Sequence, residues 1–252
     1  VRNAATGFPV GNKGYITTGY NPDQKYLADT WEYDPETNTW RQMDDFKGGA
    51  RYYALGFGID YYGYVGTGYN DNYIKDFYRF DPTAAAGSQW TIVNGFGGQK
   101  RQGATAFVIN GKAYVCGGQN NNSDVSDFWC FDPSAATPWT QLRDIANTSD
   151  DDYDDDYTSI VRSYGVSFVI DGKAYLTLGS TAGGSYYSNY WIYDPETDLW
   201  EGDDLTAFEG STRIHAVCFS TGTRGIIATG GSGSSSYFDD TWELKPYEYE
   251  EE

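Results

Sequence analysis

The feature that most constrains the fold is a segment of about fifty residues that recurs five times along the chain. Each copy opens with an arginine and an apolar run, as in Arg101 followed by QGATAFVIN. Consecutive opening arginines lie 49, 50, 61 and 51 residues apart. Self-similarity at this period is typical of repeat architectures, in which each copy is one supersecondary unit. The opening residues are Arg2, Arg51, Arg101, Arg162 and Arg213.

Each copy predicts four short strands. After the apolar run comes a second strand that ends in glycine, such as GYITTGY or AYVCGG, and then an aromatic third strand, such as DTWEYDP or DFWCFDP. Asp-Pro ends the third strand in four copies, and proline stops strand pairing because it has no N–H to donate. A fourth strand carries a lone tryptophan, which the fifth copy does not reach; these are Trp40, Trp90, Trp139 and Trp200. Four strands per fifty residues, repeated radially, predict the blades of a β-propeller.

Composition agrees with an all-β fold. Aromatic residues make up 18% of the chain and glycine contributes 31 residues, which favours pleated strands joined by tight turns. The sequence shows no long amphipathic helix and no apolar run near the ~20 residues of a membrane span. We therefore expect a single β-propeller domain over residues 1–252, built from four-stranded antiparallel blades.

The order of arginine strand, glycine strand, aromatic strand and tryptophan strand resembles the kelch repeat over nearly the whole chain. Within that family the sequence is most similar to secreted or lipid-anchored bacterial proteins described as galactose-oxidase-like. The resemblance implies a propeller closed by a strand from one terminus. The fifth repeat lacks its tryptophan strand, so we expect an N-terminal strand that is not in this chain to complete it. The acidic tail YEYEEE, residues 247–252, is the alternative.

Strand alternation predicts which loops share a face. The loops between strands two and three should lie beside the opening arginines at one channel mouth, and they are rich in Tyr, Asn, Ser and Gly, a mixture suited to recognition. The arginine ring could bind a carboxylate, a sulfate or an acidic peptide. Alternatively, each arginine pairs with an acid of its own repeat. The predicted ligand-binding residues are the five opening arginines with Tyr20, Tyr69, Tyr186 and Tyr187.

One insertion breaks the repeat symmetry. The third copy carries about twelve extra residues, NTSDDDYDDDYTSI, on the same predicted face. Clustered carboxylates offer the oxygen ligands that Ca²⁺ prefers, although the pattern is not that of an EF-hand. A solvated acidic loop without metal is the alternative. The candidate calcium ligands are Asp150, Asp152, Asp154 and Asp156.

The sequence argues against catalysis. A galactose-oxidase copper site resembles two histidines with two tyrosines, and this chain has one histidine, His215. No nucleophile-elbow, P-loop or HExxH pattern is present. The remaining enzyme alternative is a mutarotase-like epimerase or lyase acting on acidic sugars, which needs an acid–base pair and an arginine for the carboxylate.

The net charge and the family resemblance limit the classes of partner that we expect. The net charge of −19 repels phosphate backbones, so nucleic acid is excluded as a partner. We expect a non-catalytic binding or scaffold protein that binds another protein or a glycan. The resemblance implies an accessory subunit of an extracytoplasmic assembly, at a bacterial cell surface, outer membrane or periplasm. Membrane association would then come only through a lipid anchor outside this chain.

Overall fold

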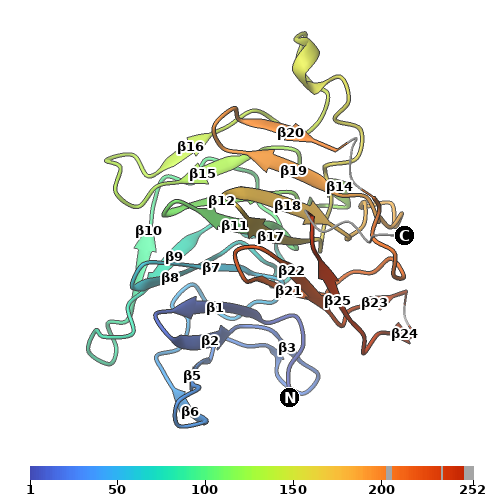
Figure 1. Cartoon of the computed structure of the whole chain (residues 1–252). Helices are drawn as coiled ribbons and strands as arrows, with labels where there is room; N and C mark the ends of the chain where they lie inside the picture. Colours follow the sequence, from blue (N-terminus) through green and yellow to red (C-terminus); the bar gives the residue numbers. More distant parts are fainter. Residues whose placement is uncertain (203–205, 234, 247–252) are drawn as a thin grey trace.

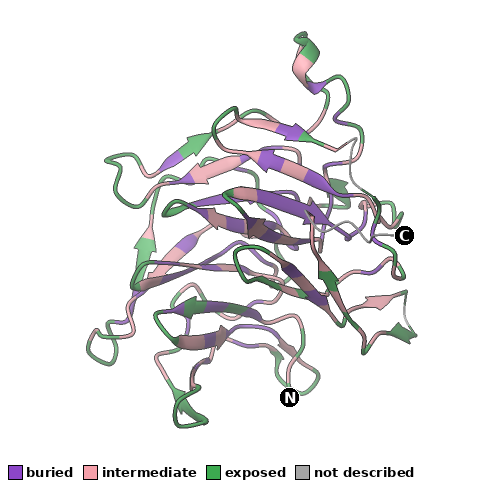
Figure 2. Ribbon diagram, in the orientation of Figure 1, coloured by how far each residue is buried: buried purple, intermediate pink, exposed green. Residues whose placement is uncertain are grey.

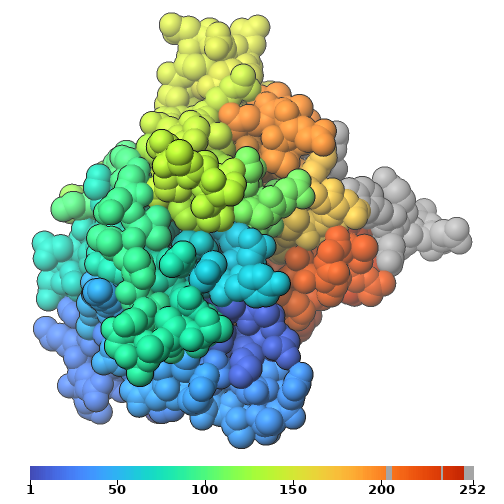
Figure 3. Space-filling view, turned by 90° about the vertical axis from the view of Figure 1, so that its left-hand side faces the viewer, coloured from blue at the N-terminus to red at the C-terminus, as the bar shows by residue number. Residues whose placement is uncertain are grey.

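The computed structural model describes residues 1–202, 206–233 and 235–246, and it forms a five-bladed all-β propeller. Figure 3 views the disc from one face, and the colours follow the chain from one blade to the next around it. Four blades are four-stranded antiparallel sheets, and the fifth sheet has three strands among the described residues. The acidic tail that we weighed as its fourth strand, residues 247–252, lies outside the described residues.

The strands follow the order expected from the repeat. Blade 1 contains β1 (Thr6–Val10), β2 (Lys13–Thr17), β5 (Thr30–Asp34) and β6 (Thr39–Gln42). Blade 2 contains β7 (Leu55–Ile59), β8 (Tyr62–Gly66), β9 (Phe77–Phe80) and β10 (Trp90–Val93). Blade 3 contains β11 (Thr105–Ile109), β12 (Lys112–Cys116), β15 (Trp129–Phe131) and β16 (Trp139–Gln141). Blade 4 contains β17 (Val166–Ile170), β18 (Lys173–Thr177), β19 (Trp191–Asp194) and β20 (Leu199–Glu201). Blade 5 contains β21 (Val217–Ser220), β22 (Gly225–Ala228) and β25 (Thr241–Leu244).

Short hairpins extend the loops between the second and third strands of three blades. They lie together on the side of the disc drawn at the right of Figure 1. These hairpins are β3 (Tyr20–Asn21) with β4 (Lys25–Tyr26), β13 (Gln119–Asn120) with β14 (Ser123–Asp124), and β23 (Gly231–Ser232) with β24 (Ser236–Tyr237). The loops expected to share a face therefore do share it.

The core is divided among the contacts between consecutive blades, where Figure 2 shows most of the buried segments. In blades 1 to 4 the phenylalanine of the inner strand stacks on the tyrosine of the second strand, as Phe8 does on Tyr15 with ring centroids 5.5 Å apart. The next blade covers this pair with Phe80, whose ring lies 5.2 Å from that of Tyr15. The same arrangement recurs at Phe57 and Phe107. Burial of such large rings is a main source of the free energy that holds adjacent blades together.

A glycine at the end of each second strand allows the backbones to approach closely. Gly179 has a φ of +86°, and a Cβ built there would lie 2.6 Å from the carbonyl oxygen of Ser163. Its amide donates to the carbonyl oxygen of Arg213 in the next blade at 3.0 Å. Only glycine combines this φ with such a close approach. Gly19, Gly68 and Gly118 make the equivalent hydrogen bond to the opening arginine of the next blade.

Candidate functional site

The opening arginines lie beneath the hairpin face rather than on it. The side chains of Arg51, Arg101 and Arg213 are at most 1% exposed, Arg162 is equally buried as a whole residue, and the Arg2 side chain is 19% exposed. Each guanidinium donates to the carbonyl oxygen of the residue sixteen positions later, at 2.8 to 3.1 Å. A guanidinium suits this position because its several N–H groups bond in different directions at once.

Each arginine also meets a polar side chain at the start of its own third strand. Four of these partners are aspartates and one is an amide. The pairs are Arg2–Asp29, Arg51–Asp76, Arg101–Asp127, Arg162–Asn189 and Arg213–Asp240. This geometry favours the structural alternative for the ring, because its donors are turned into the protein rather than toward the channel mouth. Ligand binding by these arginines remains a prediction from sequence and gains no support from their placement.

Aromatic side chains gather above the arginines instead. We call this group the tyrosine face; it comprises Tyr20, Tyr26, Tyr52, Tyr53, Tyr69, Tyr73, Tyr164 and His215. Tyr52 is its centre: its ring stacks on Tyr26 at 5.6 Å and meets Tyr69 edge-on at 5.7 Å. The hydroxyl of Tyr26 donates to Asp71 at 2.7 Å, which joins the loops of blades 1 and 2. This hydrogen bond raises the pKa of Tyr26 to about 12.

Three rings from three blades meet at the channel mouth. Tyr53, Tyr164 and His215 have centroids 4.6 to 5.0 Å apart, and each is two residues after an opening arginine. All three have a φ between +52° and +61°, and the equivalent Ala4 and Gly103 have φ values of +49° and +64°, so this left-handed turn belongs to the repeat. Gln102 and Gln119 donate to the Tyr164 hydroxyl at 2.7 and 2.8 Å. Desolvation lowers the pKa of His215, so its imidazole is neutral at pH 7.

These rings line a cavity of about 770 Å³. Its wall is completed by Asn3, by Tyr237 and by backbone of the glycine turns, such as Gly230. The described residues that line it include neither lysine nor arginine. The cavity can therefore stack a flat or apolar surface against rings and bond it through amide groups, but it offers no cation for an acidic ligand.

The four tyrosines expected from sequence have different positions. Tyr20 and Tyr69 belong to the tyrosine face. Tyr187 lies against the guanidinium of Arg162 at 4.7 Å, and Tyr186 accepts a hydrogen bond from the amide of Gly233 at 2.8 Å. Sequence reasoning missed the channel-mouth rings. The position two residues after each arginine faces the mouth in every blade, but it holds Ala4, Tyr53, Gly103, Tyr164 and His215, so the sequence alone does not mark the three rings as a group.

The acidic insertion projects outward from the rim of the disc, at the top of Figures 1 and 3. It contains a 3₁₀ turn, η1 (Asp152–Asp154). Asp154 is buried and accepts hydrogen bonds at 2.9 Å from the amides of Thr148 and Ser149, so it holds the loop from within. Asp150, Asp152 and Asp156 are exposed. Across the described residues, no group of three or more His, Cys, Asp or Glu side chains is placed to hold a metal ion. Calcium binding stays a prediction.

The three cysteines are free thiols, with Cys116 buried and Cys130 and Cys218 partly buried. Burial raises the pKa of Cys116 to about 12, so this thiol is unreactive at neutral pH. In the described residues, no helix is long and apolar enough to cross a membrane.

Fold and site together define a β-propeller whose loops carry a cluster of aromatic side chains on one face. The family model for the KLHDC2/KLHL20/DRC7 Kelch-repeats domain matches residues 10–151, more than half of the chain. The chain belongs to the kelch-repeat family. Kelch-repeat domains are in general binding modules rather than enzymes, and they bind proteins.

The chain is similar to a kelch-like protein in sequence and to a solved propeller in structure. Kelch-like protein 15 from Danio rerio is 26% identical over 203 residues. That match covers 76% of this chain and 33% of the relative, so the chain spans about a third of the relative's length. The solved structure of YjhT superposes with a TM-score of 0.77 at 14% identity, covering 98% of this chain and 82% of that one. At this identity the second match speaks for the fold alone.

Proposed function

We propose that this kelch propeller recognises a protein partner through its tyrosine face. The observation that carries the proposal is an unbroken chain of ring contacts that joins loops of four blades into one surface; it runs from Tyr26 through Tyr52, Tyr53 and Tyr164 to His215. These rings are only partly buried or exposed. Tyrosines on a rigid scaffold supply large contact area at small cost in conformational entropy, and they are enriched where binding energy concentrates.

We further propose that the protein acts as an accessory subunit of an extracytoplasmic assembly, at a bacterial cell surface or in the periplasm. Support comes from the resemblance to secreted and lipid-anchored kelch proteins and from the net charge of −19, which keeps a scaffold soluble. Fractionation of the native source tests this setting. Recovery with the cell envelope supports an extracytoplasmic location, and recovery in the cytosol would contradict it.

The partner experiment is a pull-down from the native source in mild detergent, with mass spectrometry of whatever co-purifies at stoichiometric amounts. The test variant is Tyr52→Ala, which removes the ring that touches four neighbours of the face. The matched control is Tyr61→Ala, because Tyr61 is 77% exposed in the β7–β8 turn on the other side of the disc. Loss of the partner with Tyr52→Ala alone supports the proposal. Equal retention by both variants contradicts it.

Binding of a glycan is the second candidate, and the cavity at the channel mouth favours it. About 770 Å³ lined by Tyr53, Tyr164 and His215 suits a small ligand that stacks on rings. The absence of a cation among the described lining residues favours an uncharged sugar. The epimerase alternative for acidic sugars is not supported, because the arginines that it requires are bound to polar side chains of their own repeats. A glycan array with Tyr164→Ala as control separates this candidate from protein binding.

A further inference from the structure

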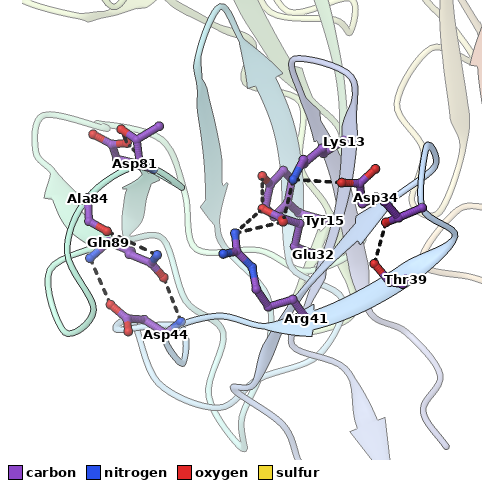
Figure 4. Close-up of polar contacts among 12 residues, drawn as sticks. Lys13, Tyr15, Glu32, Asp34, Thr39, Arg41, Asp44, Asp81, Ala84 and Gln89 are labelled. Atoms are coloured by element: carbon purple, nitrogen blue, oxygen red, sulfur yellow. Dashed lines mark hydrogen bonds and ion pairs between the residues drawn. The ribbon is translucent and has the colours of Figure 1, made fainter.

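The lysines of the chain divide into two groups according to their ionic partners. One group binds carboxylates of its own blade at the strand ends opposite the hairpins; Figure 4 shows Lys13 of this group between Glu32 and Asp34. Its other members are Lys112, Lys173 and Lys245. The second group is exposed, and no ion pair joins it to a carboxylate within the described residues; it comprises Lys25, Lys47, Lys75 and Lys100. All of the second group lies in hairpin-face loops of blades 1 and 2 or in the loops that follow those blades.

Two of the unpaired lysines are held side by side. The amide of Arg101 donates to the carbonyl oxygen of Ile74 at 3.1 Å, and these two residues form an antiparallel bridge. Lys75 follows Ile74 and Lys100 precedes Arg101, so the bridge sets the two lysines opposite each other. We call them the lysine pair. Like charges directly opposite each other destabilise an antiparallel pair, and an anion bound beside them would remove this repulsion.

Two aspartates adjoin the lysine pair, and both are already bound. Both carboxylate oxygens of Asp76 accept hydrogen bonds from Arg51. Asp127 accepts from Arg101 and from the amide of Gln99. The equivalent positions of the other blades hold no pair of charges; they are Ala28 with Ala50, Ser126 with Val161, and Ser188 with Thr212. The lysine pair is therefore a departure from the repeat and not part of what holds each blade together.

Lys100 also lines a polar pocket of about 200 Å³ between the loops of blades 2 and 3. The other lining residues include Tyr69, Asp71, Tyr73, Asn120 and Asn121. Tyr69 and Tyr73 belong to the tyrosine face, so the pocket and that face form one continuous surface. Asp71 is the one carboxylate among the described lining residues, and its Oδ1 accepts the hydrogen bond from Tyr26.

The groups of this pocket suit a peptide carboxylate better than a free phosphate. The ammonium group of Lys100 can bind a carboxylate, and the amides of Asn120 and Asn121 can both donate and accept. Asp71 would repel a phosphate, which carries about two negative charges at pH 7. An acidic residue within a peptide offers the carboxylate to Lys100 and its backbone N–H groups to the acceptors of the pocket.

We propose that the partner segment bound by the tyrosine face is acidic, and that one of its aspartate or glutamate side chains enters this pocket and binds the lysine pair. This inference rests on the function proposed above and specifies the chemistry of the partner. The net charge of −19 repels an acidic segment elsewhere on the surface, so the lysine pair sets where it docks. The cavity at the channel mouth, whose described lining has neither lysine nor arginine, then receives an uncharged part of the same segment.

The probe is a phage-displayed library of short random peptides, selected on the immobilised protein at low ionic strength. The selected peptides should contain an excess of aspartate and glutamate over the input library. The strongest binders are then synthesised with fluorescein, and their affinity is measured by fluorescence anisotropy. Replacement of the anchoring acid by its amide should weaken binding about tenfold, and the affinity of the acidic peptide should fall as ionic strength rises.

Variants of the protein locate the anchor. Lys100→Glu should weaken binding of the acidic peptide about tenfold or more, whereas Lys100→Arg, which keeps the charge, should bind nearly as the parent does. Lys112→Glu is the matched control, because it changes the net charge equally but lies at the opposite face, where Lys112 pairs with Asp132. It should bind as the parent does. Circular dichroism checks that each variant is folded.

Tyr52→Ala separates this inference from the proposed function. Weaker binding by both Tyr52→Ala and Lys100→Glu supports both. Weaker binding by Tyr52→Ala alone keeps the tyrosine face as the binding surface and overturns the acidic anchor. Weaker binding by Lys100→Glu alone supports the anchor and contradicts the tyrosine face as the binding surface. A selection that yields no binding peptide, or peptides with no excess of acidic residues, also overturns the inference.

Discussion

Arg162 is buried opposite Asn189, at the position where the other four repeats place an aspartate. Its Nη2 donates to the amide oxygen of Asn189 at 3.1 Å. Burial lowers the pKa of Arg162 to about 10, so the guanidinium is still charged at neutral pH. A buried cation whose acceptors are carbonyl oxygens rather than a carboxylate is less well compensated than a paired one. Among the five opening arginines, Arg162 of the fourth blade is therefore the one whose buried charge is least well compensated.

Asn189→Asp should stabilise the protein. The new carboxylate would accept the same hydrogen bond from Arg162, and bonds to charged groups contribute about 1.5 to 3 kcal/mol. Desolvation of the carboxylate offsets part of this, so we expect a gain of about 1 kcal/mol in the free energy of unfolding, measured by urea denaturation. Asp127→Ala, which strips the carboxylate from buried Arg101, should cost about 3 to 5 kcal/mol. A destabilised Asn189→Asp variant would show that desolvation of the new carboxylate outweighs its pairing.

Acid should weaken the arginine ties. The hydrogen bond from Arg213 holds the pKa of Asp240 to about 2, below its ordinary value of 3.8. Burial alone would raise the pKa of Asp29, but hydrogen bonds from Arg2 and Trp31 outweigh it and lower that pKa too. A carboxyl group whose pKa is lower in the folded state stabilises the fold above its unfolded pKa. That contribution is lost as pH falls through the folded pKa.

The expected profile is a melting temperature that falls between about pH 4 and about pH 2. Asp240→Asn should lower the melting temperature at pH 6 and flatten the fall at acid pH, because the variant has no carboxylate to protonate there. Asp60→Asn, in an exposed turn, should follow the parent at every pH. Superimposable profiles for Asp240→Asn and the parent would show that the fall in melting temperature does not come from the Arg213–Asp240 pair.

Repetition made the fold predictable. Five copies of one pattern predict the strand order and the face that each loop shares, and blades 1 to 4 each pack on the next blade in the same way. The stacking of Phe57 on Tyr64 in blade 2 therefore predicts the stacking of Phe107 on Tyr114 in blade 3. Residues that follow the repeat, such as Tyr20 and Tyr69 in the second-to-third-strand loops, could be placed in advance.

The site was harder to predict because it depends on departures from the repeat. The sequence shows five repeated arginines, but it does not show that Thr18 turns its carbonyl oxygen toward the guanidinium of Arg2, or Leu178 toward that of Arg162. The channel-mouth position holds Ala4 in one repeat and Tyr53 in the next, so its alignment has no common chemistry. Only the meeting of three blades at the axis makes Tyr53, Tyr164 and His215 a group.

Asp154→Ala should loosen the acidic insertion without affecting the blades. The buried carboxylate satisfies the amides of Thr148 and Ser149, which would lose their acceptor. We expect faster hydrogen exchange at these two amides and easier proteolysis within residues 147–158. Asp152→Asn, on the exposed side of the turn, is the control and should exchange as the parent does.

Calcium binding is tested on the parent protein and on Asp152→Asn. If the insertion binds the ion, calcium should raise the parent's melting temperature, chelator should reverse the rise, and Asp152→Asn should diminish it. If Asp154 alone organises the loop, neither calcium nor chelator should move the melting temperature of the parent.

Phe219 and Phe107 occupy the same position in their inner strands, but their exposed fractions differ. Phe107 is 4% exposed under Tyr193 and Trp200 of the next blade, whereas Phe219 is 59% exposed. Removing a buried phenylalanine costs about 3 to 5 kcal/mol, and exposed substitutions usually stay within about 0.5 kcal/mol. Phe107→Ala should therefore destabilise the protein severely in urea denaturation, while Phe219→Ala should be almost neutral. A comparable loss for both would mean that Phe219 is covered in solution, and that the fifth blade has a neighbour on its inner-strand face.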